Sequence, residues 1–443
     1  MKKKLLMTFG PVIVAALLFI GCLALPANNS PKVIRNASQS MNVNVLSGEH
    51  LKNTAMKDDE YVPFFGSSEL NRFDPFHPSV LATKYHRNYR PFLLGSAGTQ
   101  SLKQYMIMTS MQDEMSQRKR KKAIFIISPQ WFIKGGVRQE YFSHWYSGVQ
   151  MYHWLYQMTK KDHYTTGDLH FARRVQHFDI IKQNTDVMRY VKKIGDNEPL
   201  TASDKRSIER SYNNLMYEDR LYGRLGLTAK NWNRVVKNTK PLPAVYNYQK
   251  LDKLAYKIGK KGTSNNNLQI ANSFYNSRLR TVMGTMKDKD KGLSYIQSPE
   301  YADFQLVLDE FNRTKTDVLF IIPPVNERWI KYTGLSQPML NQFAAKVTKQ
   351  LRAQGFNNVV NMVDDHESYF MTDTIHIGWR GWLKCDQYIR PFLESAYTKP
   401  DYKMNDYYYS TEWQNYQPKE SPKKTDKVKA QHKKEEHKET HKK

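Results

Sequence analysis

Residues 62–70 read Val-Pro-Phe-Phe-Gly-Ser-Ser-Glu-Leu, an apolar run that ends in a glycine and two hydroxyl residues. A short apolar run bounded by turn residues predicts a buried strand, and Gly66 permits a tight turn after it. Open α/β folds build their sites at the carboxyl ends of such strands. We therefore expect the hydroxyls of Ser67 and Ser68 at this edge, where the same motif can also serve only as a helix cap.

Four more apolar runs follow along the chain, and helical patterns lie between them. The predicted strands are 62–65, 91–94, 123–127, 318–322 and 359–363. Apolar residues recur with the spacing of one helix face over 304–311 and again over 340–351. Continuous apolar strands that alternate with helices predict a three-layer α/β sandwich with a mostly parallel sheet.

One long segment, from about 136 to 298, interrupts this alternation. It is polar and helix-like, and Thr201 and Asp204 have the spacing of a capping box at a helix start. We expect a helical insertion between the third and fourth strands of a body that spans 58–400. The functional residues should therefore come from both sides of the insertion.

The two ends of the chain are expected to lie outside this body. Lysines 2–4 precede an uncharged run over 5–25, which makes a helix of about 31 Å and can cross a bilayer. We expect residues 1–26 to form a cytoplasmic start and a single transmembrane signal anchor, with a polar spacer over 27–57 and an extracellular body. A cleaved signal peptide would export the same body. The basic residues 401–443 are expected to form a largely disordered tail.

Composition narrows the classes of partner and cofactor. The 443-residue chain has 68 Lys and Arg against 42 Asp and Glu, a formal charge of +26, which favours a polyanionic partner or an anionic surface. Only Cys22 and Cys385 are present, so neither an intradomain disulfide nor a Cys-based zinc site is available, and the histidines lack metal-ligand spacing. We expect no cofactor and no metal. In an exported body, the basic tract 118–122 does not predict nucleic-acid binding.

A second motif supplies the partners that a reactive serine needs. Asp373 and His376 follow the last predicted strand and precede a helix. An imidazole takes the proton from a serine hydroxyl, and a carboxylate fixes the imidazole tautomer and stabilises its charged form. The pair therefore indicates a Ser-His-Asp centre, although a single histidine is more often a hydrogen-bonded core or loop residue.

Taken together, these motifs resemble the SGNH (GDSL-type) hydrolase and acyltransferase superfamily. The resemblance implies Ser68 as the nucleophile, His376 as the base and Asp373 as the orienting acid. Ser67 stands where that superfamily commonly has Asp, next to the nucleophile on the substrate side.

The same resemblance assigns the oxyanion hole, which stabilises the charge that develops on the substrate carbonyl. The backbone N–H of Gly98, in the second conserved block, is the expected donor. The third block normally carries an Asn, but here Ser-Pro-Gln-Trp-Phe occupies 128–132. Gln130 has a longer side chain than Asn, so the resemblance implies a weakened or specialised oxyanion hole.

Within that superfamily, the chain is most similar to the family of D-alanine transfer protein D of the dlt system. The likeness covers most of the chain and includes the lysine-led anchor and the motifs at 64–70, 98–102, 128–132, 323–326 and 373–376. It implies a membrane-anchored extracellular protein that takes part in D-alanyl ester transfer to lipoteichoic acid. A membrane-bound O-acyltransferase and a D-alanyl carrier protein are the implied partners. Two alternatives stay open: a noncatalytic scaffold for these partners, and an esterase or thioesterase of D-alanyl groups.

Overall fold

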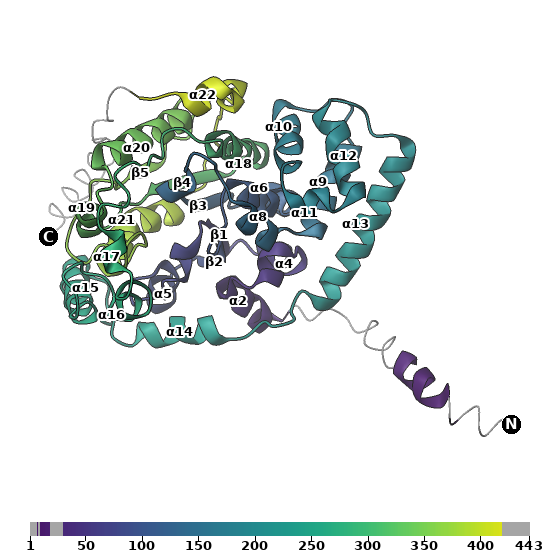
Figure 1. Cartoon of the computed structure of the whole chain (residues 1–443). Coiled ribbons are helices and arrows are strands. Elements are labelled where there is room, and N and C mark those ends of the chain that lie inside the picture. The colour runs from purple at the N-terminus through teal and green to yellow at the C-terminus, as the bar shows by residue number, and fades with distance from the viewer. Residues whose placement is uncertain (1–6, 8, 18–29, 419–443) are drawn as a thin grey trace.

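The computed structural model describes residue 7, residues 9–17 and residues 30–418 (Figure 1). A five-stranded sheet with the strand order β2-β1-β3-β4-β5 forms its centre, and every neighbouring pair of strands is parallel. The strands are β1 (Tyr61–Phe65), β2 (Arg90–Leu94), β3 (Lys122–Ile126), β4 (Asp317–Ile322) and β5 (Val359–Asn361). All five predicted strands are present, with ends within two residues of the prediction. The expected α/β class with a parallel sheet is confirmed.

Helices surround this sheet (Figure 1). The helix α18 (Glu300–Thr314) packs on the sheet through Phe311, whose ring lies 5.8 Å from Phe65 of β1 and 6.1 Å from Phe320 of β4. The predicted helices over 304–311 and 340–351 are confirmed as parts of α18 and α20. The other helices outside the insertion and the two chain ends are α5 (Pro78–Lys84), α6 (Ser101–Thr109), α7 (Gln112–Gln117), α19 (Glu327–Thr333), α20 (Gln337–Arg352) and α21 (Trp379–Glu394).

Between β3 and α18 the described elements are helical. Thr201 accepts the backbone N–H of Asp204 and Asp204 accepts that of Thr201, so the predicted capping box begins the longest of these helices. The segment wraps around the body, because α14 contacts α5 and α15 contacts α21. These elements are a short turn η2 (Pro129–Trp131), α8 (Gln139–Trp145), α9 (Gly148–Thr159), α10 (Thr166–Val175), α11 (Asp179–Lys182), α12 (Thr185–Gly195), α13 (Ala202–Tyr222), α14 (Lys230–Thr239), α15 (Tyr248–Gly262), α16 (Asn272–Phe274), η3 (Tyr275–Leu279) and α17 (Met283–Met286).

The spacer predicted over 27–57 is wrong for residues 31–56, which form three helices packed against the body. These are α2 (Pro31–Ser40), α3 (Val43–Ser47) and α4 (His50–Met56). Ile34, Ala37 and Leu46 are buried, and α2 lies beside β2. Each helix is short and buries only a few apolar residues among Asn and Ser, so no sustained period shows in the sequence.

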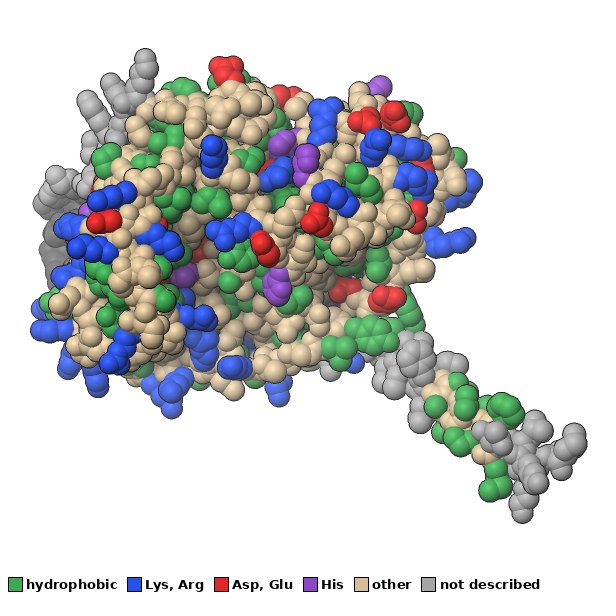
Figure 2. Space-filling view, viewed as in Figure 1, with side chains coloured by type: hydrophobic (Ala, Val, Ile, Leu, Met, Phe, Trp, Pro, Cys, Tyr) green, Lys and Arg blue, Asp and Glu red, His purple; other side chains and the backbone are tan. Residues whose placement is uncertain are grey.

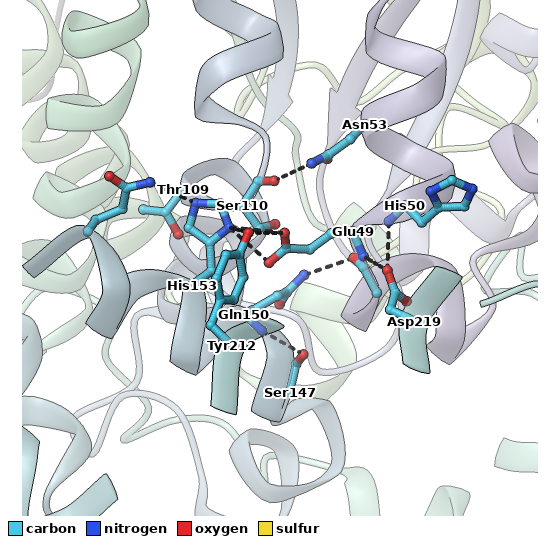
Figure 3. A network of polar contacts seen from close by, with 12 residues as sticks. Glu49, His50, Asn53, Thr109, Ser110, Ser147, Gln150, His153, Tyr212 and Asp219 are labelled. Carbon is cyan, nitrogen blue, oxygen red and sulfur yellow. Dashed lines mark hydrogen bonds and ion pairs between the residues drawn. The ribbon is translucent and has the colours of Figure 1, made fainter. Parts of the chain in front are cut away.

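A buried polar network holds α4 against the insertion (Figure 3). Glu49 accepts a hydrogen bond from the Tyr212 hydroxyl of α13 at 3.3 Å, and its carboxylate lies 3.0 Å from Nδ1 of His153 in α9. The Asp219 carboxylate of α13 accepts the backbone N–H groups of Glu49 and His50 at 2.8 and 2.7 Å, which satisfies donors at the start of α4. The N-terminal helices and the insertion therefore pack as one body.

The disordered tail predicted over 401–443 is wrong for residues 401–418. These residues include η4 (Asp406–Tyr409) and α22 (Thr411–Asn415). Trp413 is buried, and the buried Lys346 donates to the carbonyl of Gln414 at 3.0 Å. Aromatic residues anchor this segment despite its polar composition. The rest of the predicted tail, 419–443, lies outside the described residues.

Most of the predicted membrane anchor also lies outside the described residues. Over 5–25, only residue 7 and residues 9–17 are described, and they are helical. Within the described part of the chain, no helix combines the length and the apolar character that a membrane span requires.

Candidate active site

Two chain segments, 308 residues apart in sequence, meet beyond the carboxyl end of β1. The Ser68 hydroxyl oxygen lies 2.6 Å from Nε2 of His376. Nδ1 of the same imidazole lies 2.7 and 2.8 Å from the two carboxylate oxygens of Asp373. The structure therefore brings the three predicted residues into one hydrogen-bonded series, hydroxyl to imidazole to carboxylate, which is the geometry of a Ser-His-Asp triad.

Ser68 owes its position to the turn that follows β1. It begins a short 3₁₀ turn, η1 (Ser68–Asn71), and is half-buried. The carbonyl of Gly66 in this turn accepts hydrogen bonds from the Thr99 hydroxyl at 2.9 Å and from the side-chain amide of Gln104. A side chain at Gly95 would place its Cβ 2.1 Å from that carbonyl oxygen. The loop after β2 thus packs its backbone directly against the turn that carries Ser68.

The loop between β5 and α21 fixes the imidazole and the carboxylate. Asp373 accepts the backbone N–H groups of Ile375 and His376 at 3.1 and 3.0 Å. The side chain of Asn326 donates to the carbonyl of Asp373 at 3.2 Å, which gives a structural role to the Asn of the motif at 323–326. The loop is braced by hydrogen bonds on both sides, so the triad geometry does not depend on one contact.

Asp373 is suited to stay ionised beside the imidazole. Its side chain is 1% exposed, and burial alone would raise its pKa. The hydrogen bond and charge of His376, followed by the charge of Arg72, outweigh burial and hold the pKa of Asp373 below its ordinary value. An ionised carboxylate at this place can orient and stabilise a protonated imidazole.

Ser67 takes no direct part in this series. Its hydroxyl donates to Oε2 of Glu69 at 2.7 Å, and Glu69 also accepts the backbone N–H of Ser67 at 2.6 Å. The indole N–H of Trp131 donates to the Ser67 hydroxyl at 3.3 Å. Ser67 is buried, and its hydrogen bonds to Glu69 and Trp131 brace the turn that carries Ser68.

The two predicted oxyanion residues lie on loops near the sheet edge. Gly98 has a φ of +84°, and an added Cβ would meet the Tyr141 ring at 2.6 Å, so both conformation and packing require glycine there. Gln130 is half-buried in η2. Within the described chain, no hydrogen bond links either residue to Ser68, His376 or Asp373.

Arg72 is a residue of the site that the sequence analysis missed. Its Nη2 lies 3.1 Å from Asp373 Oδ2 and 3.3 Å from Nδ1 of His376. The guanidinium lies over the ring of Phe274 in α16, at 5.4 Å, so the insertion also contributes to the site. Nothing in the sequence distinguishes Arg72 from the other Lys and Arg residues, which number 68 in all. Its place directly after η1 brings its guanidinium to the site.

His77, the N-cap of α5, supports the serine turn in its neutral form. Its Nε2–H donates to the carbonyl of Leu70 at 3.1 Å, and its Nδ1 accepts the backbone N–H of Ser79 at 3.2 Å. The side chain is fully buried, and burial lowers the pKa of His77 to about 3. A proton on Nδ1 would remove the cap and place a charge in the core.

Stability should therefore fall with pH below the ordinary histidine pKa of about 6.5. Between that value and pH 3, His77 binds a proton in the unfolded chain but not in the folded one. The free energy of unfolding contributed by His77 therefore falls by up to about 1.4 kcal/mol for each unit that the pH is lowered. His77→Asn keeps a capping oxygen and should show a shallower loss in urea unfolding at pH 7.5, 6 and 5. Asp74, whose pKa burial raises to about 7, titrates with the opposite sign and is present in both proteins.

The matched control for this prediction is His163→Asn, which changes an exposed histidine. It should keep the pH slope of the unchanged protein. Equal slopes for the His77 and His163 variants would contradict the assignment of a neutral, buried imidazole at position 77.

The fold and the site define a class: α/β proteins that carry a Ser-His-Asp arrangement at the carboxyl edge of a parallel sheet. Comparison with known proteins then narrows the class to a family. Residues 38–394 match the family described as "DltD protein". The chain belongs to the DltD family, as its motifs predicted.

Similarity to individual relatives extends over nearly the whole chain. The chain is 41% identical over 411 residues to "Protein DltD" of Lacticaseibacillus rhamnosus, which covers 91% of this chain and 95% of that protein. It is 30% identical over 407 residues to "Protein DltD" of Bacillus subtilis (strain 168), covering 89% and 99%. For "Protein DltD" of Staphylococcus aureus (strain NCTC 8325 / PS 47), the identity is 26% over 392 residues, covering 87% and 96%.

Proposed function

We propose that this chain is a membrane-anchored extracellular acyltransferase that acts in the D-alanylation of teichoic acid. The observation that carries the proposal is the hydrogen-bonded series of Ser68, His376 and Asp373 in a member of the DltD family. A serine hydroxyl is a weak nucleophile unless a base takes its proton, and this series provides that base and its orienting carboxylate.

In the first half of the proposed reaction, Ser68 Oγ attacks the carbonyl carbon of a D-alanyl ester or thioester. Nε2 of His376, 2.6 Å away, takes the hydroxyl proton, and Asp373 stabilises the imidazolium that forms. The backbone N–H groups of Ser68 and Gly98 are the proposed oxyanion donors. The intermediate then expels the alcohol or thiol, which receives the proton from His376, and the D-alanyl group stays as an ester on Ser68.

In the second half, a glycerol hydroxyl of lipoteichoic acid gives its proton to His376 and attacks the acyl-serine. The new ester forms on the polymer, and the bond to Ser68 breaks as its oxygen regains a proton from His376. If water takes the place of the glycerol hydroxyl, the same residues make an esterase or thioesterase.

The charge of the body favours a polyanionic acceptor. The chain has a formal charge of +26, and Figure 2 shows Lys and Arg side chains spread over the visible face, with fewer acidic ones. Arg72 brings a cation, 35% exposed, directly to the triad. Positive potential at a site raises the local concentration of an anionic polymer such as lipoteichoic acid.

The proposal includes the location and partners expected from sequence. Residues 5–25 anchor the chain, with the N-terminus cytoplasmic and the body outside the cell. The partners are lipoteichoic acid, a membrane-bound O-acyltransferase and a D-alanyl carrier protein.

The pathway assignment is tested in cells by the D-alanine ester content of lipoteichoic acid. Cells without this chain should carry less ester than parent cells, and a plasmid copy of the full chain should restore it. An unchanged ester content in cells without the chain would contradict the pathway assignment, whatever the chemistry of Ser68.

A further inference from the structure

Part of the helical insertion is bonded to the loop that carries the Asp-His pair. The backbone N–H of Ala271 donates to the carbonyl of Thr372 at 2.8 Å. The side-chain amide of Asn326 donates to the carbonyl of Leu268 at 3.0 Å and to that of Asp373 at 3.2 Å. The end of the insertion that leads into α16 therefore lies against the residues next to the carboxylate of the site.

Phe274 of α16 connects the insertion to the serine turn as well. The guanidinium of Arg72 lies over the Phe274 ring, 5.4 Å from its centroid, and a planar guanidinium is suited to such stacking. Arg72 follows η1 directly, four residues after Ser68, and its Nη2 lies 3.1 Å from Asp373 Oδ2. A continuous series of contacts thus leads from the insertion through Arg72 to the Asp373 carboxylate.

The Asp373 carboxylate is buried and depends on the donors around it. Its Oδ1 accepts the backbone N–H groups of Ile375 and His376, whereas its Oδ2 lies 2.8 Å from Nδ1 of His376 and 3.1 Å from Nη2 of Arg72. Within the described residues, the backbone donors reach only Oδ1. Removal of a donor from a buried carboxylate costs more than the loss of an ion pair in solvent, so Arg72 is placed to fix Oδ2.

The charge of Arg72 also lies next to the imidazole. Nη2 is 3.3 Å from Nδ1 of His376, and a positive charge there opposes the gain of a second proton by the ring. Three further charged groups surround this pair. Asp373 lies on the same loop as His376, and the Glu69 carboxylate is bonded within the serine turn. Arg234 lies on α14, and burial, followed by the charge of Arg72, lowers the pKa of Arg234.

We propose that Arg72 is a positioning residue of the Ser-His-Asp centre and that Phe274 of the insertion holds it in place. Arg72 fixes Asp373 Oδ2 and favours the neutral imidazole that takes the proton of Ser68. The insertion thereby supports the reactivity of a serine that lies outside it. This role deepens the proposed function and rests on it, because it is expressed in the reaction of Ser68.

The rate at which a fluorophosphonate probe labels Ser68 in the full chain, kept in detergent, tests this role. We expect Arg72→Gln to lower the rate by about tenfold to a hundredfold, because small misplacements of reacting groups are costly. Arg72→Lys keeps the charge but not the planar fork and should lose less. The control Arg278→Gln removes an exposed arginine four residues after Phe274 and should be labelled like the unchanged chain.

The pH profile of labelling separates positioning from general support of the fold. Without the positive charge at residue 72 the imidazole gains a proton more easily, so labelling of Arg72→Gln should begin at a higher pH than labelling of the unchanged chain. Arg72→Lys should keep the original profile. If Arg72→Gln is labelled more slowly at every pH with its profile unmoved, Arg72 only supports the turn, and the proposal is overturned.

A double-mutant cycle tests the contribution of the insertion. Phe274→Leu should slow labelling by about two- to fivefold when Arg72 is present, and should not slow it further in Arg72→Gln, because the ring acts through the guanidinium. Phe274→Tyr keeps an aromatic face and should stay near the original rate. Phe274→Leu is also the milder variant that serves if Arg72→Gln fails to fold. An equal loss with and without Arg72 would contradict the role of Phe274.

Hydrogen exchange gives a readout that does not depend on the reactivity of Ser68. The backbone N–H groups that bond to Asp373 should exchange faster in Arg72→Gln and in Phe274→Leu, but not in the Arg278 control. If the unchanged chain is not labelled while exchange rises in this way, the proposed reaction fails and the positioning of the carboxylate stands. If Arg72→Gln keeps both the labelling and the exchange of the unchanged chain, the positioning role is wrong.

Discussion

Replacing Ser68 or His376 with alanine is expected to reduce D-alanyl transfer by about 10⁴-fold or more, the effect typical of losing a member of a serine triad. Ser68 Oγ and Nε2 of His376 are 2.6 Å apart, so each variant removes one end of the proposed proton transfer from the hydroxyl to the imidazole. In cells that express equal amounts of each protein, the D-alanine ester on lipoteichoic acid should fall to the level of cells without the chain.

Two other serines provide controls for this prediction. Ser207→Ala removes an exposed hydroxyl from α13 and should leave the ester content unchanged. Ser67→Ala separates the two neighbouring serines, because the Ser67 hydroxyl is directed to Glu69 and should affect stability more than chemistry. If cells with normally expressed Ser68→Ala protein keep the ester level of parent cells, Ser68 is not the nucleophile, and the noncatalytic scaffold becomes the favoured function.

Gly95→Ala is expected to displace the serine turn without changing any catalytic side chain. Its Cβ would lie 2.1 Å from the oxygen and 2.5 Å from the carbon of the Gly66 carbonyl, and 3.1 Å from the backbone nitrogen of Ser67. These are backbone atoms of a buried turn, so the steric clash with the new Cβ can be removed only if the turn itself moves. We expect about 1–3 kcal/mol of destabilisation from such overpacking and a loss of transfer of at least about a hundredfold, since small misplacements of reacting groups are costly.

The control is Gly135→Ala, where an added Cβ has open space around it. Urea unfolding and transfer should both stay close to the unchanged protein. If Gly95→Ala behaves like Gly135→Ala in both measurements, the close packing of the second loop against the serine turn does not position Ser68.

The strands and the triad were predictable because their signals are local. Each buried strand is a continuous apolar run, and Asp373 and His376 stand close together after the last one. The carboxyl ends of parallel strands lie at one edge of the sheet, so Ser68 was expected to lie near Asp373 and His376. The structure adds the distances, which no sequence pattern contains.

Other parts of the site depend on tertiary contacts that leave no pattern in sequence. The resemblance implied Gly98 as an oxyanion donor, but nothing in the sequence singled out Gly95, which packs against the serine turn, because that role depends on the close approach of two backbones. Arg72 acquires its role only when the two distant segments meet. Residues 31–56 were predicted as a spacer because helices this short depend on partners elsewhere, such as Asp219 in α13, more than on their own periodicity.

The measurement that tests the central claim most directly is labelling of the full chain with a fluorophosphonate probe, followed by identification of the modified peptide. Such a probe reacts with activated serine hydroxyls, and the proposed mechanism predicts that reactivity at Ser68, whose hydroxyl oxygen lies 2.6 Å from Nε2 of His376. We expect one labelled site, at Ser68, lost in His376→Ala and retained in Ser207→Ala. Absence of label at Ser68 in the folded protein, or equal labelling with and without His376, would contradict an activated serine.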